Sequence, residues 1–396
     1  MTDSTAAQKV LVINCGSSSI KSALYANAEA HQPELTALAE QLGTPEARLL
    51  IHQQPALAID APHDHEAALR ALLQQLSTQL PSIVGVGHRV VHGGERFSAS
   101  TVIDDATLSQ LEQVSGLAPL HNPVNLLGIH TLRQLLPQVP QVAVFDTAFH
   151  QSLHPAAYLY GVPYDWYQQD GVRRYGFHGT SYRYVSQTAA QQLNKPLSEC
   201  RLLIAHLGNG CSACAIDGGQ SVDTTMGLTP LEGLVMGSRS GDVDAGIFDY
   251  MARSRNLSAA DIVHELNKNS GLKGLSNDLS NDMRTLLEAE ANGNEDAQRA
   301  IDVFCFRAAR QLAALHASLP ALDALVFTGG IGEHAAAIRQ RIVSAWRSLP
   351  FALDPKLNAS HGDATGRISQ PDSPLVMVIA TNEERMIAAD TYECIA

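Results

Sequence analysis

The feature that most constrains this 396-residue chain is an internal repeat with a spacing of 192 positions. An apolar segment ends at Asn14, and a turn of Cys, Gly and Ser leads into a second segment at 20–25. The same order recurs at 202–216, where Gly208 aligns with Gly16. We interpret each copy as two strands joined by a turn whose backbone N–H groups can bind phosphate. Two copies predict two related halves that hold opposite ends of a phosphate chain, and a pair of ordinary hairpins is the alternative.

Composition places the chain among globular proteins and restricts its partners. A hydrophobic content of 45% with 17% charged residues supports large cores, and the length favours two domains. The net charge of −13 argues against a nucleic-acid-binding surface, although arginines can still bind a small anion locally. Residues 1–9 do not resemble a signal peptide, and no apolar run approaches the ~20 residues that span a bilayer. We therefore expect a cytoplasmic protein with neither a nucleic-acid nor a membrane partner.

Six cysteines are scattered along the chain, and two of them form a CxxC pair, Cys211 and Cys214. No second pair and no suitably spaced histidine completes a zinc site. Because the residues at 211–216 alternate as in a strand, we interpret the pair as strand packing.

Strands and helices alternate along the chain, which predicts an α/β fold with ligands at the strand ends. Strands are expected in 83–95 and at 142–145, 324–327 and 375–380, helices at 181–193 and 300–315, and a Gly-rich turn at 328–333. No GxxxxGK[ST] motif is present, so the phosphate site is not a P-loop. An aromatic, Pro-bearing stretch at 151–165 marks the expected domain crossing. We expect one domain at 1–150 with 384–396, and a second at 151–383.

The last helix is expected to begin at Thr381, with Glu384 three residues later as a capping box. In that arrangement the Glu384 carboxylate accepts from the Thr381 N–H and has a structural role. The neighbouring Glu383 is then available for chemistry.

Two arginines are candidates for binding a phosphate or carboxylate group. Arg89 follows an apolar strand in HRVVHGGE, and Arg239 lies in GSRSGDVD. A planar, five-donor guanidinium beside Gly-rich backbone suits a clamp on such anions. Surface ion pairs are the alternative for either arginine.

Four other polar residues lie near these segments, each with a structural alternative. Asp146 ends a buried strand, where α/β enzymes place catalytic acids, but aspartate is also a good N-cap. His178 lies close to Gly176 and Gly179 in RRYGFHGTS, where it could equally be an ordinary hydrogen-bonded histidine. Asn14 closes the first strand, and Lys21 follows the first turn as a phosphate ligand or a solvated side chain.

Seven ordered motifs between residue 10 and about 390 resemble the signatures of the acetate kinase family. They are LVINCGSSSIK, HRVVHGGE, FDTAFHQ, RRYGFHGTS, HLGNG, GSRSGDVD and TGGIGE. The resemblance implies an α/β fold of two duplicated actin-like (ribonuclease H-like) domains with a nucleotide cleft between them. It implies reversible, Mg²⁺-dependent, in-line phosphoryl transfer from ATP to acetate, with Mn²⁺ as an alternative metal, by a homodimer.

The resemblance also implies roles for individual residues. The phosphoryl chemistry is implied at Asp146, His178, Arg239 and Arg89, and the metal at Asn14 and Glu383. ATP or ADP is implied to contact Lys21, Ser17, His206, Leu207, Gly208, Asn209, Gly210, Asp282, Met283, Arg284, Gly330, Ile331, Gly332, Glu333 and His334. The acid is implied to contact Arg89, Val91, Leu120, Phe177 and Pro230.

Two departures from the family pattern fall near the expected nucleotide base. His334 stands where the family usually has Asn, and the loop at 273–284 is slightly longer than expected. A propionate kinase on the same scaffold is the nearest alternative function. A non-catalytic nucleotide-binding module of the same superfamily is a distant alternative, because it would not need Arg89, Asp146, His178 and Arg239 together.

Overall fold

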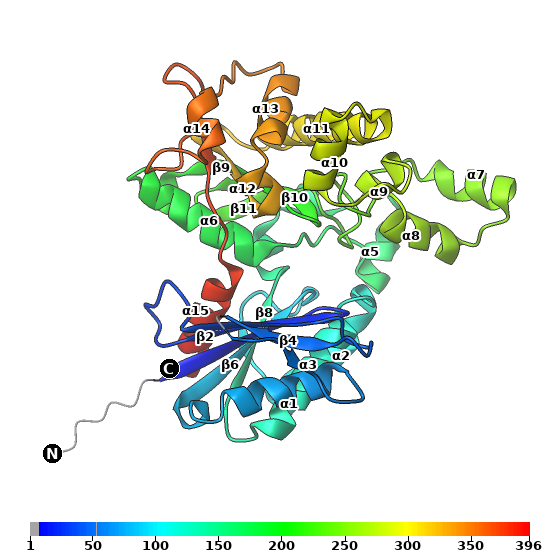
Figure 1. Ribbon diagram of the computed structural model, residues 1–396. Coiled ribbons are helices and arrows are strands. Elements are labelled where there is room, and N and C mark those ends of the chain that lie inside the picture. The colour runs from blue at the N-terminus through cyan, green and yellow to red at the C-terminus, as the bar shows by residue number, and fades with distance from the viewer. Residues whose placement is uncertain (1–7, 53) are drawn as a thin grey trace. The chain divides into compact units, whose positions relative to one another are not determined.

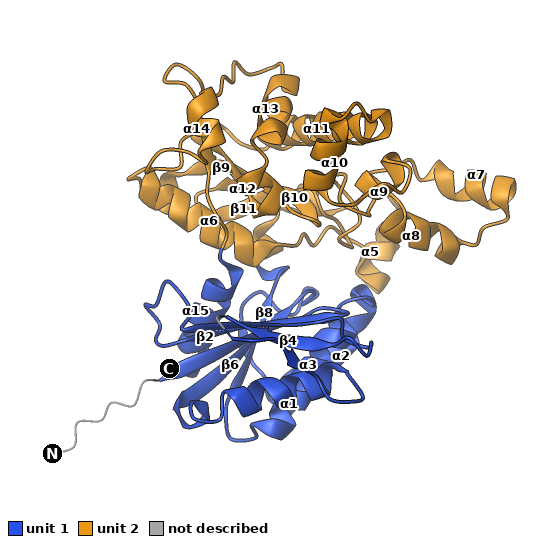
Figure 2. Ribbon diagram, in the orientation of Figure 1, with its two compact units in different colours: residues 1–149, 382–396 blue, residues 150–381 orange. Residues whose placement is uncertain are grey.

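The computed structural model describes residues 8–52 and 54–396. The described chain forms two compact units (Figures 1 and 2). Unit 1 contains the described residues up to Phe149 together with Asn382–Ala396, and unit 2 is His150–Thr381.

Unit 1 is built on an eight-stranded sheet of order β5-β4-β3-β2-β1-β6-β8-β7. Its strands are β1 (Lys9–Cys15), β2 (Ser19–Tyr25), β3 (Leu35–Glu40), β4 (Arg48–Ile51), β5 (Leu57–Ala58), β6 (Ile83–Val90), β7 (Thr101–Val102) and β8 (Gln141–Phe145). β1, β6 and β8 are parallel neighbours, while β2 and β3 continue the sheet antiparallel from β1. The carboxyl ends of β1, β6 and β8 therefore lie along one edge of the sheet.

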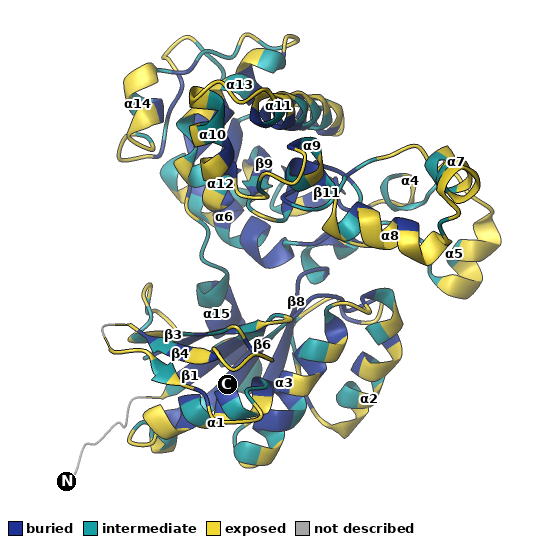
Figure 3. Cartoon of the chain, turned by 45° about the vertical axis from the view of Figure 1, so that its right-hand side comes forward, coloured by how far each residue is buried: buried dark blue, intermediate teal, exposed yellow. Residues whose placement is uncertain are grey.

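Helices cover both faces of this sheet because the buried residues of β1 alternate between two cores. The helices are α1 (His65–Gln75), α2 (Asp105–Val114), α3 (Asn122–Leu135) and α15 (Glu383–Ile395), with 3₁₀ turns at Leu80–Ser82, Ser115–Leu117 and Ala148–Ser152. Leu11 and Ile13 pack in the core that includes residues of α1 and α3. Val10 and Val12 pack with Ile387 and Ala388 of α15 on the other face. In Figure 3 the start of α15 is coloured as intermediate in burial.

Unit 2 repeats the central plan of unit 1 in a five-stranded sheet of order β11-β10-β9-β12-β13. Its strands are β9 (Arg201–Leu207), β10 (Cys211–Asp217), β11 (Gln220–Thr224), β12 (Ala324–Thr328) and β13 (Val376–Val378). The strand directions match those of β3-β2-β1-β6-β8 throughout. The bounds of β9 and β10 equal those of β1 and β2 shifted by 192 positions, so the repeat seen in the sequence is confirmed.

The helices of unit 2 lie before the first strand of its sheet and in the segments between later strands. They are α4 (Pro155–Tyr158), α5 (Tyr164–Asp170), α6 (Gly179–Gln192), α7 (Gly246–Arg255), α8 (Ala259–Lys268), α9 (Gly271–Leu275), α10 (Met283–Ala291), α11 (Glu295–His316), α12 (Gly329–His334), α13 (Ala336–Ala345) and α14 (Pro355–Ala359), with a 3₁₀ turn at Leu197–Glu199. The apolar stripe predicted at 300–315 is buried in α11 as expected. Among the described residues, no helix combines the length and the apolar character needed to cross a bilayer.

The Gly-rich segment at 328–333 was predicted as a turn, and this prediction is wrong. Residues Gly329–His334 form helix α12. The buried guanidinium of Arg339 donates to the carbonyl oxygens of Gly332 and Glu333, both at 2.8 Å, and so satisfies carbonyls at the end of the helix. A tertiary contact therefore compensates for the low helix propensity of glycine.

The capping box predicted at Thr381 and Glu384 is also wrong. Helix α15 begins at Glu383, and Asn382 is its N-cap, accepting a hydrogen bond from the Arg385 N–H. The Thr381 N–H instead donates to the Glu333 carboxylate at 3.2 Å. Asparagine caps helices as well as threonine does, so the long-range contact to Glu333 decides where the helix starts.

The interpretation of the CxxC pair as strand packing is confirmed. Cys211 and Cys214 are free, buried thiols of β10. Burial raises the pKa of Cys211 to about 12, which keeps this thiol protonated and unreactive.

Candidate active site

The edge of the unit 1 sheet brings three of the predicted site residues together. Asn14 lies in β1, Arg89 in β6 and Asp146 directly after β8. The Arg89 guanidinium donates to both oxygens of Asp146, from Nε at 2.9 Å and from Nη2 at 2.6 Å, and to Asn14 Oδ1 at 3.4 Å. The two-point contact fixes the plane of the guanidinium, and Asp146 does not act as an N-cap here.

Carboxylates surround this arginine on more than one side. Burial lowers the pKa of Arg89, but the charges of Asp146, Glu383 and Glu384 outweigh burial and raise it, so the group stays charged. Burial and, to a smaller extent, the charges of Asp146 and Glu384 raise the pKa of Glu383, the charge of Arg89 lowers it, and the net result is a pKa of about 7. Three acidic groups thus face one guanidinium at the start of α15, which is a setting that favours an additional cation.

The predicted metal residues offer hard oxygen donors of the kind Mg²⁺ binds. They are the Asn14 amide oxygen and the Glu383 carboxylate, at the end of β1 and the start of α15. In the described part of the chain, no group of three or more His, Cys, Asp or Glu side chains is arranged to hold a metal ion. Mg²⁺ usually takes one or two protein ligands and completes its shell with water and phosphate oxygens.

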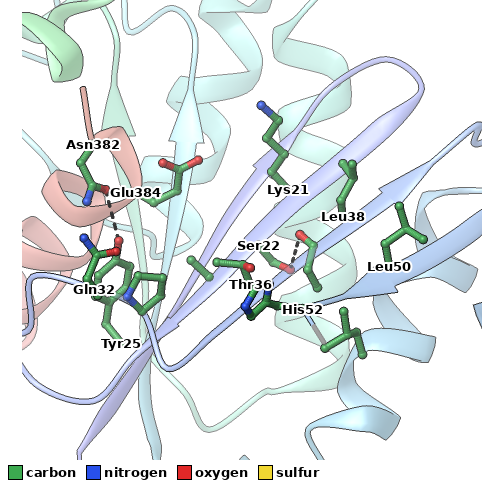
Figure 4. Close-up of a pocket in the computed structure, with 14 residues that line it drawn as sticks. Lys21, Ser22, Tyr25, Gln32, Thr36, Leu38, Leu50, His52, Asn382 and Glu384 are labelled. Atoms are coloured by element: carbon green, nitrogen blue, oxygen red, sulfur yellow. Dashed lines mark hydrogen bonds between the residues drawn. The ribbon is translucent and has the colours of Figure 1, made fainter. Parts of the chain in front are cut away.

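A hollow of about 490 Å³ on unit 1 begins beside this cluster (Figure 4). Lys21 and Glu384 border it, and Leu38 and Leu50 line it on the sheet. Lys21 is exposed on β2, so its ammonium group can reach a phosphate, as can the exposed Ser17 in the preceding turn.

In unit 2 the second Gly-rich turn collects two other predicted residues. Gly208 donates its N–H to the carbonyl of Gly210 at 3.1 Å, which closes the turn between β9 and β10. A methyl group on Gly210 would lie 3.6 Å from His178 Nε2 and 3.9 Å from Arg239 Nη1. The turn backbone, the imidazole and the guanidinium therefore converge on one point of unit 2.

The backbone conformation of His178 and contacts with two neighbouring side chains define the position of its ring. Its backbone lies in the left-handed region (φ 57°, ψ 22°) directly before α6, a conformation that costs energy outside glycine. Its Nδ1 is 2.7 Å from Ser212 Oγ, and its ring stacks on His206 with centroids 4.2 Å apart. His206 in turn has Nδ1 2.8 Å from Ser181 Oγ. These contacts turn the Nε2 edge of His178 toward Gly210.

The loop that carries Arg239 packs directly on the same turn. Gly237 donates its N–H to the Asn209 carbonyl at 2.9 Å, and a side chain on Gly237 would collide with Asn209 Oδ1 at 1.8 Å. The Arg239 side chain donates from Nη1 to the Pro230 carbonyl at 3.2 Å. The backbone bond between Gly237 and Asn209 thus brings the Arg239 loop onto the turn, and a side chain at position 237 would require the Asn209 side chain to move.

The residues assigned to the nucleotide have mixed structural roles. Glu333 accepts hydrogen bonds from the N–H groups of Gly329 and Thr381, so it braces the entry to α12. Asp282 is the N-cap of α10, accepting from the Thr285 N–H at 2.9 Å. Among the other assigned residues, the side chains of Arg284 and His334 are exposed, and those of Met283 and Leu207 are buried.

Besides Arg89, the four residues expected around the acid belong to different units. Val91 and Leu120 are in unit 1, and Phe177 and Pro230 are in unit 2. Val91 and Phe177 are buried, while the Leu120 side chain is 56% exposed. Within unit 2, Phe177 precedes His178, and Pro230 contacts Arg239 through its carbonyl.

Sequence reasoning missed a group of residues that supports the unit 2 cluster. Tyr160 and Arg174 both donate hydrogen bonds to Glu232, although 72 residue positions separate Tyr160 from Glu232. Arg174 lies in the motif RRYGFHGTS, but no local pattern marks Glu232 as its partner.

The chain was compared with known proteins. A family model described as the Acetokinase family matches residues 9–389. An acetate kinase from Stutzerimonas stutzeri (strain A1501) is 53% identical over 392 residues, which cover 97% of this chain and 98% of the relative. One from Chromobacterium violaceum is 49% identical over 96% of this chain and 97% of the relative.

Two solved structures are similar to the present one over nearly their whole length. A propionate kinase from Francisella tularensis gives a TM-score of 0.93 at 42% identity, covering 98% of this chain and 99% of that one. A Porphyromonas gingivalis acetate kinase gives a TM-score of 0.91 at 40% identity, covering 98% of this chain and 100% of that one. The predicted fold class is confirmed by this likeness.

Proposed function

Because the chain belongs to the Acetokinase family, we propose that it transfers the γ-phosphoryl group of ATP to acetate, reversibly, giving acetyl phosphate and ADP. The observation that carries the proposal is the two-point hydrogen bond of Arg89 to Asp146, together with the convergence of His178 and Arg239 on Gly210. Both sets present positive charge and hydrogen-bond donors without a covalent nucleophile.

The reaction brings two anions together, and its difficulty is electrostatic. The transferring phosphoryl group is trigonal in the transition state and spreads negative charge over three equatorial oxygens. We assign Arg89 and Arg239 to those oxygens and to the incoming carboxylate, with His178 as a further donor. Preorganised donors of this kind act most strongly where charge develops, so they lower the barrier to direct in-line transfer.

No general base is required, since a carboxylic acid with an ordinary pKa near 4 is already ionised at neutral pH. Asp146 is suited to a positioning role because both of its oxygens accept from Arg89. Asp146 then keeps the Arg89 fork in one orientation, so the arginine does not have to be ordered when the substrate binds.

We assign Mg²⁺ to Asn14 and Glu383, with Mn²⁺ as an alternative, because their oxygens lie in the carboxylate-rich part of unit 1. When bound, the metal ion would neutralise charge on the nucleotide phosphates. The carboxylates of Asp146 and Glu384 near Arg89 would repel each other less in its presence.

The nucleotide is assigned mainly to unit 2, which we interpret as the nucleotide-binding domain, and unit 1 is interpreted as the domain that binds the acid and the metal. The Gly208–Gly210 turn offers backbone N–H groups to phosphates, and α12 supplies Gly330 and Ile331 for the base. The lysine of unit 1, Lys21, adds a point charge near the phosphates.

Propionate is the second candidate acceptor, and the likeness to a Francisella tularensis propionate kinase favours testing it. One additional methylene in an apolar pocket changes discrimination by only about 1–3 kcal/mol. The residues assigned to the methyl end of the acid, such as Val91 and Phe177, are compatible with either substrate.

We further propose that the protein is a cytoplasmic homodimer. Helix α7 contains Ile247, Phe248 and Tyr250, yet none of its residues is buried, and it is largely exposed in Figure 3. Such an apolar helix face is typical of a surface covered by a partner, here a second copy. The free cysteines at the described positions agree with a reducing compartment.

The proposed activity can be tested by trapping the acyl phosphate with hydroxylamine. Purified protein is incubated with ATP and acetate, propionate or butyrate, with Mg²⁺ or with excess EDTA. We expect most hydroxamate from acetate, less from propionate, little from butyrate and none in EDTA. Absence of product from every acid would refute the proposal, and a clear preference for propionate would replace acetate as the substrate.

A further inference from the structure

A cluster of three polar side chains supports the unit 2 part of the proposed active site from behind. Glu232 accepts a hydrogen bond from Arg174 Nη2 on Oε1 at 2.6 Å and a short one from the Tyr160 hydroxyl on Oε2. The Tyr160 hydroxyl oxygen also accepts from the Leu228 N–H at 2.9 Å. We call Tyr160, Arg174 and Glu232 the loop anchor.

The loop anchor fixes the backbone of the segment 224–232 at several points. Arg174 Nη1 donates to three successive carbonyls, those of Thr224, Thr225 and Met226, at 3.0, 2.9 and 3.2 Å. Gly227 packs so closely that an added methyl group would lie 1.6 Å from Glu232 Oε2. The segment therefore cannot shift without breaking its hydrogen bonds to the loop anchor.

Both catalytic candidates of unit 2 are connected to this segment. The Gly227 carbonyl accepts from the N–H groups of Tyr175 at 3.0 Å and Gly176 at 3.3 Å, two residues before His178. The Pro230 carbonyl accepts from Arg239 Nη1. A displacement of 224–232 would thus move the approach to His178 and the acceptor that orients Arg239.

The ends of the Arg239 loop are tied down beside Glu232 as well. Gly233 and Asp242 pair through an N–H to carboxylate bond of 2.7 Å and an N–H to carbonyl bond of 3.0 Å. Gly233 has φ +103° and follows Glu232 directly. This pairing holds together the backbone on the two sides of Arg239, and the Pro230 carbonyl is an acceptor for the Arg239 guanidinium.

We propose that Glu232 is a positioning residue for phosphoryl transfer, acting with Tyr160 and Arg174 through the Pro230 carbonyl to hold the Arg239 guanidinium. This inference rests on the proposed function and identifies how the Arg239 guanidinium of unit 2 is oriented. The chemistry of the anchor suits the role: burial and the charge of Glu232 raise the pKa of Tyr160, so the phenol stays protonated and donates. The anchor does not touch the substrate in this proposal.

The test uses Glu232→Gln in the full-length protein, which keeps the side-chain shape but removes the charge and one acceptor. A displacement of about 1 Å at a catalytic group can cost 10²-fold in rate, so we expect kcat with acetate to fall about 10- to 100-fold. Tyr160→Phe removes the two hydrogen bonds of the hydroxyl group but keeps the Glu232–Arg174 ion pair, and it should lower kcat about threefold to tenfold. It serves as the second variant if Glu232→Gln does not fold.

The matched control is Glu290→Gln, which removes the charge from another glutamate of the same unit that is paired with an arginine, here through two hydrogen bonds with Arg341. Thermal unfolding of both variants reports any general loss of stability, and kcat should change less than twofold in the control. Equal kcat losses in the two variants would overturn the inference.

A double-mutant cycle with Arg239→Ala separates positioning from a merely structural role. If Glu232 acts through Arg239, Glu232→Gln should change kcat less than twofold once Arg239 is absent. Multiplicative losses would contradict the inference even if both single variants are slow. A wild-type protein that makes no acyl phosphate would instead refute the proposed function, so the two failures are distinguishable.

Discussion

The two units share one sheet plan but present different side chains at equivalent positions. The strand registers place Thr328 of unit 2 where unit 1 has Arg89. In the same way, Thr381 occupies the place of Asp146. Unit 1 therefore has an ion pair at its sheet edge, and unit 2 has two threonines.

Unit 2 obtains its charged groups from segments added to the sheet. His178 precedes α6, and Arg239 lies in the loop between β11 and α7. The repeat position of Lys21 is Ala213, a buried residue of β10. The two units therefore share the positions that the sheet offers but differ in the residues that occupy them. Unit 1 has its charged groups on or next to the strands, whereas unit 2 has Gly-rich turns and has its charged groups in the segments outside the strands.

The largest expected effect is that of replacing Arg239, in the loop between β11 and α7 of unit 2. Arg239→Ala should lower kcat by about 10²–10³-fold, comparable to the loss of one oxyanion-stabilising donor. The hydroxamate assay measures this directly, and Arg310→Ala, an exposed arginine on α11, is the control. A near-normal kcat would remove Arg239 from the phosphoryl-transfer site.

The next prediction tests the metal assignment in unit 1. Glu383→Gln should raise the Mg²⁺ concentration for half-maximal activity by about 10–100-fold, because a charged ligand becomes neutral. Titrations of activity against Mg²⁺ for the wild type and the variant give the comparison. An unchanged Mg²⁺ requirement, with a protein that unfolds normally, would remove Glu383 from the metal site.

A smaller effect is expected from the packing of α15 on the unit 1 sheet. A methyl group on Gly87 would lie 2.3 Å from Thr391 Oγ1 and 2.7 Å from an Ile387 carbon. Gly87→Ala should therefore lower the free energy of unfolding by about 1–3 kcal/mol through overpacking. Gly116→Ala, where no atom lies within 4 Å, should be close to wild type in urea unfolding. Equal stability of both variants would show that α15 tolerates displacement.

One buried histidine in each unit gives a matched pH prediction. Burial lowers the pKa of His88 and of His150 to about 4, against opposing hydrogen bonds to Gln141 and the Phe177 carbonyl. Both are neutral when folded, so stability is complete above the unfolded pKa near 6.5 and falls as the pH drops toward 4. Each histidine contributes at most about 1.4 kcal/mol per pH unit to this slope.

His88→Gln and His150→Asn should each reduce that slope in urea unfolding measured between pH 6.5 and 4.5. The difference from wild type cancels the contribution of the carboxylates that titrate in the same range. A slope unchanged in both variants would mean that these histidines are protonated in the folded protein.

The sequence predicted the sheet edges better than the inserted loops. The repeat located β1, β2, β9 and β10, because apolar runs and Gly-rich turns are local features of the sequence. That Arg89 and Asp146 lie near each other could be predicted from the sequence, because parallel strands end along one edge of a sheet. Their two-point contact required the register of β6 and β8.

The errors fall where long-range contacts decide local structure. Thr381 and Asn382 are both good caps, and the contact of Thr381 with Glu333 selects Asn382. The helix at 329–334 depends on Arg339, and the loop anchor depends on Glu232. Neither partner is marked by a pattern that a single sequence can reveal.

The most direct test of the proposed chemistry is a crystal structure with ADP, Mg²⁺, acetate and nitrate. Nitrate is planar and trigonal, so it mimics the charge and shape of the transferring phosphoryl group. We predict that the guanidinium groups of Arg89 and Arg239 both donate hydrogen bonds to the same nitrate ion. Guanidinium groups bound to separate anions, with neither reaching the nitrate next to ADP, would contradict the proposal that the two units act on one phosphoryl group.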